Sequence, residues 1–212
     1  MRRTITILHS EPTEKIIEKS RFITYSARVE SEEEAKAFLA ALKDEHPFAT
    51  HICYAYIADR QGNLQRFSDN GEPQGTAGMP ILDVLQKNGL TDICCVVTRY
   101  FGGVLLGANG LVRAYSHSTA LAIENAQVKV MLPCYPVSIQ TDYALYGKIA
   151  YHLPQEDILQ LDTIFEDQVE LKLLVRDTLW EPLKKELIEL TSGQVEIVSG
   201  GLQYADFSKA KK

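Results

Sequence analysis

The sequence lacks the features that mark several specialised protein classes. Its 212 residues include four cysteines but no Cys-x-x-Cys pair, so neither a zinc site nor a thioredoxin-like redox site is indicated. No run approaches the roughly 20 consecutive apolar residues that cross a bilayer, and no apolar signal segment follows the first arginines. We therefore expect a cytoplasmic protein with no membrane partner, whose cysteines are buried free thiols.

Catalytic signatures are equally scarce. The chain has no G-x-S-x-G and no H-E-x-x-H motif. The segment GEPQGTAG lacks the Gly-Lys-Ser/Thr ending of a phosphate-binding P-loop, and GGVLLG does not have the G-x-G-x-x-G spacing of a dinucleotide site. The sequence therefore predicts no catalytic residue, no cofactor and no metal, and we expect that the protein is not a conventional enzyme.

Excess positive charge is also missing. The net charge is −6, and residues 1–134 carry 14 Lys and Arg against 15 Asp and Glu, whereas residues 135–212 carry 8 against 13. Proteins that coat nucleic acid by charge alone are usually basic, so DNA binding is not specifically implied. The near-balance of charges in the first part allows a local basic site there.

The composition that is present is that of a folded protein. Hydrophobic residues make up 45% and charged residues 24%, which are ordinary values for globular domains. Alternation and apolar runs predict strands, and apolar residues at i, i+3, i+4 and i+7 predict helices. In the first part the expected strands are Thr4–Leu8, Arg21–Val29, His51–Ala58, Leu64–Phe67 and Ile93–Thr98, and the expected helices are 32–46, Pro80–Lys87 and Leu111–Asn125.

Two prolines in residues 131–136 suggest a linker between two domains. Beyond it the pattern reads β-α-β-β-α-β, which is typical of a ferredoxin-like domain. The predicted elements are Val137–Tyr143, Ala144–Leu153, Ile158–Phe165, Val169–Val175, Leu179–Leu190 and Val195–Tyr204. The predicted domains are therefore residues 1–134 and 135–206, with a disordered basic tail at 207–212.

Two glycine-rich segments, residues 68–78 and 99–110, offer the best candidate site. The first opens into a helix, whose N-terminal amides and positive dipole end attract anions. Arg99, at the end of a buried strand, would supply a guanidinium for phosphate or carboxylate, and an adjacent aromatic side chain would stack on bases. The anion or RNA candidates are Gly75, Thr76, Ala77, Gly78, Arg99, Tyr100, Gly102, Gly103 and Arg113.

Each candidate also has a structural interpretation. The glycines equally suit tight turns and close packing, and one ring of the Tyr100–Phe101 pair is expected in the core. His51, Asp69 and Glu72 form a second candidate group, for a metal or an acid–base pair. A solvated loop, with an Asx-turn at Asp69 and an arginine pairing with Glu72, is the favoured alternative.

Three longer segments resemble the IMPACT/YigZ family. They are KSRFI at 19–23, SDNGEPQGTAGMPIL at 68–82 and VVTRYFGGVLLGANGLVRAY at 96–115. The last is highly specific, because so long a run of fixed types and spacings is improbable by chance. The resemblance covers essentially the whole chain. Asn70 stands where many relatives have a second aspartate, which argues against a paired-carboxylate metal site.

The resemblance implies an α+β protein with two domains. The first resembles the α/β sandwich shared by a small-subunit ribosomal protein domain and the fourth domain of elongation factor G, and the second resembles the ferredoxin-like fifth domain of that factor. The eukaryotic relatives regulate translation during amino-acid starvation by competing for an activator of an initiation-factor kinase. This chain looks like the bacterial form.

We therefore expect a non-enzymatic, translation-associated regulator. It would bind the ribosome, RNA or a translation factor through an anion-binding face of its N-terminal domain. The first alternative is a protein–protein adaptor in stress regulation, which an exposed apolar patch around Tyr100 and Phe101 would favour. A less favoured alternative is an enzyme acting on a small anionic substrate.

Overall fold

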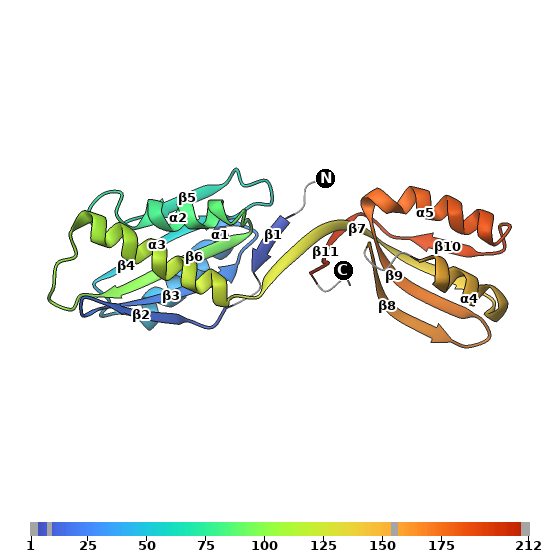
Figure 1. Cartoon of the computed structure of the whole chain (residues 1–212), viewed down its shortest axis with the longest axis horizontal. Coiled ribbons are helices and arrows are strands. Elements are labelled where there is room, and N and C mark those ends of the chain that lie inside the picture. Colours follow the sequence, from blue (N-terminus) through green and yellow to red (C-terminus); the bar gives the residue numbers. More distant parts are fainter. Residues whose placement is uncertain (1–3, 8–9, 154–156, 209–212) are drawn as a thin grey trace. The chain divides into compact units, whose positions relative to one another are not determined.

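The computed structural model describes residues 4–7, 10–153 and 157–208. They form two compact units, residues 4–129 and the described residues from Val130 onward, and each has its own antiparallel sheet and core (Figure 1). Five helices accompany the two sheets in the described part of the chain, so the predicted α+β class is confirmed. Residues 209–212 of the predicted basic tail and Leu8 of the first predicted strand lie outside the described residues.

The first unit is built on a five-stranded sheet in the order β2-β3-β6-β4-β5. Its central strand β6 is buried along almost its whole length, as the apolar run Ile93–Thr98 predicts for a strand covered on both faces. The strands are β2 (Thr13–Ile17), β3 (Ser20–Arg28), β4 (His51–Ile57), β5 (Gln65–Ser68) and β6 (Ile93–Tyr100). The short strand β1 (Thr4–Ile7) makes a parallel bridge from Ile5 to Leu90.

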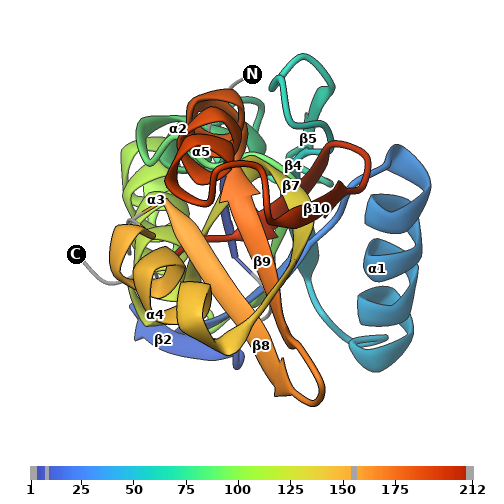
Figure 2. The same cartoon turned by 90° about the vertical axis from the view of Figure 1, so that its right-hand side faces the viewer.

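Helices cover both faces of this sheet. α1 (Glu32–Glu45) lies on the side opposite to α2 (Gly78–Lys87) and α3 (Gly107–Asn125) (Figure 2). Each face therefore has its own apolar cluster, and the neighbouring residues Cys94 and Cys95 belong to different clusters. The alternation of a strand requires this, and all four cysteines are buried and free.

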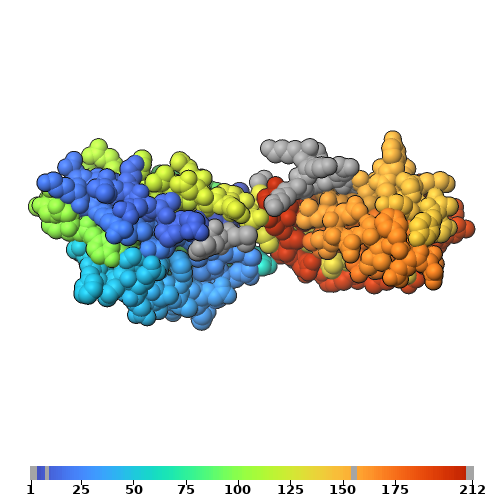
Figure 3. Space-filling view, turned by 90° about the horizontal axis from the view of Figure 1, so that it is seen from below, coloured from blue at the N-terminus to red at the C-terminus, as the bar shows by residue number. Residues whose placement is uncertain are grey.

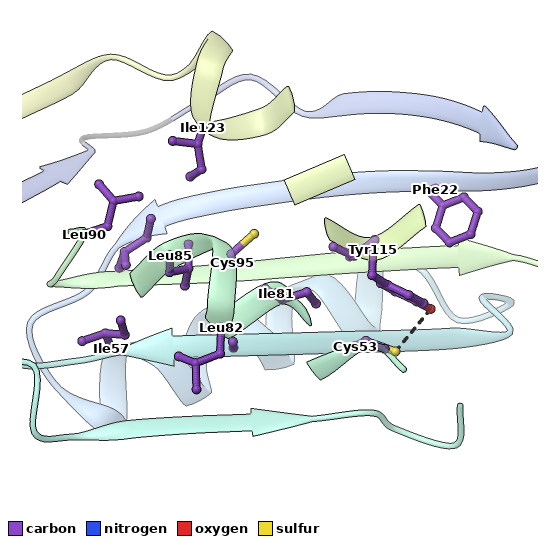
Figure 4. Packing of buried hydrophobic residues seen from close by; sticks show 14 of the residues in the cluster. Phe22, Cys53, Ile57, Ile81, Leu82, Leu85, Leu90, Cys95, Tyr115 and Ile123 are labelled. Carbon is purple, nitrogen blue, oxygen red and sulfur yellow. Dashed lines mark hydrogen bonds between the residues drawn. The ribbon is translucent and has the colours of Figure 1, made fainter. Parts of the chain in front are cut away.

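α3 begins at Gly107, four residues before the predicted start at Leu111. Its predicted stripe is confirmed: Leu111, Ala114, Tyr115, Ser118 and Ala122 are all buried. Tyr115 packs edge-on against Phe22, with ring centroids 5.4 Å apart, and its hydroxyl reaches toward Cys53 in the core (Figure 4). This helix therefore connects the core to the polar residues described below.

In the second unit the sheet order is β10-β7-β9-β8, and β11 pairs with another part of β7. The predicted succession β-α-β-β-α-β is confirmed. Both helices contribute to one apolar cluster with one face of the sheet. The elements are β7 (Val128–Thr141), α4 (Tyr143–His152), β8 (Ile158–Phe165), β9 (Val169–Arg176), α5 (Asp177–Leu190), β10 (Glu196–Ser199) and β11 (Gln203–Asp206).

Three predictions for this part of the chain are wrong. The supposed linker 131–136 lies within strand β7. Pro136 is tolerated there because it lies between the stretches that pair with β10 and β11. The single strand predicted at Val195–Tyr204 is interrupted at Gly200. Phe207 is 6% exposed and its amide donates to Val130 O, so it belongs to the folded unit and not to a tail.

No helix in the described residues combines the length and the apolar character needed to span a bilayer.

Candidate functional site

The first glycine-rich segment is closed by its own aspartate. Asp69 Oδ1 accepts hydrogen bonds from Ala77 N at 2.9 Å and Gly78 N at 2.8 Å, and Oδ2 accepts one from Gly75 N at 2.8 Å. The Thr76 hydroxyl donates to Pro73 O. The amides at the start of α2, which the sequence predicted to bind an external anion, therefore already hold a carboxylate of the same chain.

Close packing explains Gly78 and Gly102. A Cβ added at Gly78 would lie 2.7 Å from the Ser68 backbone, and one added at Gly102 would lie 2.0 Å from the Lys19 carbonyl. Both distances are shorter than side-chain atoms tolerate, so a side chain at either position would force the backbone apart. The structural interpretation of these two glycines is the one that the geometry supports.

Arg99 faces an internal carboxylate. Arg99 is 5% exposed, its Nη1 donates to Glu72 Oε1 at 2.6 Å, and its Nη2 donates to Ser20 Oγ at 3.2 Å. Glu72 Oε1 also accepts from the Tyr115 hydroxyl at 2.8 Å. The predicted free guanidinium is therefore wrong, because burying an unpaired charge is costly and Glu72 neutralises it. The expected pairing of Glu72 with an arginine is confirmed, but the pair is buried and not solvated.

We call Asp69, Glu72, Arg99, Tyr115 and the amides that they bind the closed network. Cys53 adjoins it: its thiol donates to Asp69 O at 2.9 Å and lies 3.3 Å from the Tyr115 hydroxyl. Burial raises the pKa of the Cys53 thiol to about 12, and it also raises the pKa of the Tyr115 hydroxyl. Cys53 therefore stays protonated at neutral pH, which does not suit a nucleophile.

The second candidate group, His51, Asp69 and Glu72, does not form one site. His51 Nε2 lies 3.9 Å from Glu72 Oε2, but Asp69 is committed to the α2 amides. Within residues 4–7, 10–153 and 157–208, no three His, Cys, Asp or Glu side chains are grouped so that they could hold a metal ion.

The two adjacent aromatics also have different environments. The Tyr100 hydroxyl is bound to His46 Nδ1 at 2.8 Å, whereas Phe101 is 45% exposed with the Arg99 guanidinium 5.5 Å from its ring centroid. Only Phe101 offers an open ring. The backbone of this segment is tied to the sheet, because the Phe101 and Gly102 amides donate to Thr50 Oγ1 and Ser20 Oγ.

Phe101 borders a cleft of about 360 Å³, which we call the apolar cleft. Its base carries the polar groups of His51, Glu72 and Arg99. Its walls are largely apolar. The lining residues are Thr50, His51, Glu72, Pro73, Arg99, Phe101, Leu105, Leu106, Gly107, Ala108 and Leu111.

Arg113 lines a different and more polar groove of about 520 Å³, between β2 and the first half of α3. Lys15 on β2 and His117 on α3 share it, and Lys15 Nζ approaches His117 Nε2 within hydrogen-bond reach. The atoms of β2 and α3 lie side by side in the space-filling view (Figure 3). We call Lys15, Arg113 and His117 the basic groove.

The basic groove has free charge that the closed network lacks. Among the residues described here, neither Lys15 nor Arg113 forms an ion pair, and the Arg113 Nε donates only to Asn109 O. Glu18 is the carboxylate in the lining, so the groove carries a net positive charge even with His117 neutral.

Sequence reasoning missed Lys15 because it missed β2. The hairpin from β2 to β3 turns at Glu18 and Lys19, both with positive φ of 45° and 64°. Such turns usually carry Asn-Gly or Asp-Gly, and no such signal stands here. The segment Thr13–Ile17 reads TEKII, which lacks the apolar–polar alternation that would mark a strand.

Comparison with known proteins agrees with this architecture. Residues 18–123 match the model of the Impact N-terminal domain, and residues 139–194 match a domain of unknown function, DUF1949. IMPACT family member YvyE of Bacillus subtilis is 38% identical over 95% of this chain and 93% of its own length. IMPACT family member YigZ of Escherichia coli is 34% identical over 86% of this chain and 91% of its own.

The eukaryotic relatives match a shorter segment. Protein IMPACT of Bos taurus is 36% identical over 42% of this chain and 29% of its own length. A solved structure titled as the crystal structure of a hypothetical protein superimposes with a TM-score of 0.61 and 31% identity, covering 95% of this chain and 98% of that one. The chain belongs to the IMPACT family, in the bacterial form that joins an Impact N-terminal domain to a DUF1949 domain.

Proposed function

We propose that the protein is a non-enzymatic regulator of translation that binds RNA, on the ribosome or free, through the basic groove. The observation that carries this proposal is the pair of cations, Lys15 and Arg113, that face an open groove without an ion pair among the described residues. Arg113 was among the anion-binding residues expected from the sequence. Arg99 was the other expected cation, and in this proposal Lys15 contacts the anion in its place.

The geometry of the groove suits a phosphate backbone. A lysine and an arginine on neighbouring elements can each contact a phosphate oxygen, because both side chains are long and retain free N–H groups. His117 Nε2 accepts from Lys15 Nζ, so the Nδ1–H of the neutral imidazole adds a third donor. The overall charge of −6 limits binding elsewhere on the surface, so we expect a localised contact that weakens with salt.

The fold supports the same reading. The second unit has the β-α-β-β-α-β succession and the strand order β10-β7-β9-β8 of a ferredoxin-like domain. We further propose that the first unit corresponds to the fourth domain of elongation factor G, as the family resemblance implies, and that the protein acts in the cytoplasm. The closed network supports a non-catalytic role, because its charged groups are bound to one another.

The test is co-sedimentation with ribosomes, and binding to a single-stranded RNA, across a salt series. We expect Lys15→Ala/Arg113→Ala to weaken binding and to reduce the slope of log K against log salt by about one for each lost phosphate contact. Lys87→Ala/Arg66→Ala is the matched control, since it removes one lysine and one arginine elsewhere on the same unit. Equal binding by both double variants, or no binding by the unchanged protein at low salt, would refute the proposal.

A protein–protein adaptor is the second candidate. Phe101 and Leu105 are 45% and 86% exposed and line the same cleft, and exposed apolar groups of this kind suit a protein contact. If this candidate holds, Phe101→Ser abolishes association with a protein partner and leaves the salt-dependent RNA binding unchanged, because Phe101 lines the apolar cleft alone, whereas Leu105 also lines the basic groove.

A further inference from the structure

The polar base of the apolar cleft has two hydrogen-bond acceptors that the protein does not satisfy. His51 Nδ1 lies 3.0 Å from Asn70 O. Since a carbonyl oxygen only accepts, the proton of the neutral imidazole is on Nδ1, and Nε2 carries a lone pair. Nε2 lies 3.9 Å from Glu72 Oε2, which accepts no hydrogen bond from any residue described in the structure.

These two acceptors cannot satisfy each other while His51 is neutral. A nitrogen with two or more N–H bonds can satisfy both, because their separation of 3.9 Å is less than twice a normal hydrogen-bond length of about 2.9 Å. The other oxygen of Glu72, Oε1, forms the ion pair with the Arg99 guanidinium. A cationic donor on Oε2 therefore gains a charge-assisted hydrogen bond from the side of the carboxylate that Arg99 does not occupy.

The walls of the cleft are suited to an apolar group beside that donor. Phe101, Leu105, Leu106, Leu111 and Pro73 contribute apolar surface around the polar base. The volume of about 360 Å³ lies near the small end of the range of roughly 300–1,000 Å³ that ligand pockets occupy. A branched alkyl chain of four or five carbons fits this space.

We propose that the apolar cleft binds a primary ammonium group carried on a small apolar chain, with the nitrogen between Glu72 Oε2 and His51 Nε2. Its polar groups differ from those of the basic groove and it selects a cation, although Leu105 and Leu106 line both hollows. A free alkylamine and the amino terminus of a chain that begins with an apolar residue share this chemistry.

The competing ligand is a carboxylate. The first turn of α3 also borders the cleft through Gly107 and Ala108, and its amides would favour an anion. Probes with matched alkyl groups separate the two. We therefore compare isoamylamine, isoamyl alcohol and 4-methylpentanoate by calorimetry and by NMR titration of the full chain, followed at the amides that line the cleft.

We expect saturable binding of isoamylamine, with the alcohol and the carboxylate at least about tenfold weaker. Leu-Gly-Gly and its N-acetylated form then identify the source: binding of the free peptide at least as tight as that of the amine assigns an amino terminus, and weaker binding assigns a free amine. Equal binding of the acetylated peptide, tighter binding of the carboxylate, or the absence of any saturable shift with isoamylamine would overturn the proposal.

Two variants locate the site. His51→Ala removes one acceptor and should weaken isoamylamine about tenfold. Leu105→Ser changes a side chain that is 86% exposed, so the fold is retained, and it should weaken binding about fourfold for each methylene that is no longer covered. Leu161→Ser, at a leucine in the second unit that is 60% exposed, is the matched control. An unchanged affinity in Leu105→Ser, or an equal loss in Leu161→Ser, would show that the amine binds elsewhere.

Discussion

The closed network and the basic groove each contain an arginine, but the arginine of the network stabilises the fold and that of the groove is available to a ligand. Arg99 and Glu72 are almost completely buried and neutralise each other at 2.6 Å. Arg113 is exposed and Lys15 is half-buried, and neither has a carboxylate partner in the described part of the chain. Burial, and not residue type, therefore decides which arginine is available to a ligand.

This difference predicts opposite effects of mutation. Removing one partner of a buried ion pair destabilises the fold, because the other charge stays buried without a counter-charge. Removing an exposed cation changes stability little and weakens the binding of an anion. The four predictions below test that contrast in order of decreasing effect on stability.

The largest effect should come from Glu72→Ala. It leaves the Arg99 guanidinium buried without its carboxylate and removes the acceptor of the Tyr115 hydroxyl. We expect the free energy of unfolding to fall by about 3–5 kcal/mol, measured by urea denaturation. Glu124→Ala, at an exposed position of α3, should change it by less than about 0.5 kcal/mol. Similar losses in the two variants would mean that the buried pair is not special.

Asp69→Ala should have the next largest effect. It removes the carboxylate that accepts three backbone amides at the start of α2. We expect a loss of about 2–3 kcal/mol, because charge-assisted capping bonds are lost together. Asp69→Asn retains one carbonyl oxygen and should recover part of the loss. If the asparagine variant is as unstable as the alanine variant, the capping interpretation fails.

Asp92 offers a contrasting buried carboxylate. It is 1% exposed and neither of its carboxylate oxygens has a hydrogen-bond partner in the described structure, although Oδ2 lies 3.6 Å from Arg60 Nε in an ion pair. Burial raises the pKa of its carboxyl and outweighs the opposing effect of Arg60. The folded protein therefore holds this proton more tightly than the unfolded chain, and stability is lost as pH rises through the raised pKa.

Asp92→Asn should accordingly stabilise the protein at pH 7 by about 1 kcal/mol. The substitution suits the backbone, since asparagine tolerates the positive φ of 51° at this position. Its advantage should shrink toward zero below about pH 4, near the ordinary pKa of an aspartate, where the native carboxyl is protonated in both states. Urea denaturation at the two pH values measures this, and an advantage that grows with acid would contradict the assignment.

The smallest effect on stability is expected for Arg113→Ala. Its side chain is exposed and its hydrogen bond to Asn109 O is long, at 3.3 Å. We expect thermal unfolding to change by less than about 0.5 kcal/mol, while RNA binding weakens. A large loss of stability would place Arg113 with the closed network instead.

The sequence alone determined much of this protein. Hydrophobic periodicity located α1 and α3, the buried run Ile93–Thr98 located the central strand, and the β-α-β-β-α-β order of the second unit followed from local pattern. The long specific segments also indicated the family. These features depend on neighbouring residues, which the sequence displays directly.

Only the tertiary structure decided the state of the charged residues. Glu72 and Arg99 are 27 positions apart, and Lys15 and His117 are 102 apart, so no spacing rule could join them. The hairpin at Glu18–Lys19 lacks a recognisable turn signal, and the two prolines within β7 gave a false prediction of a linker. Whether a guanidinium binds an internal carboxylate or faces solvent depends on what the fold brings beside it, because the cost of burying a charge is set by its spatial neighbours.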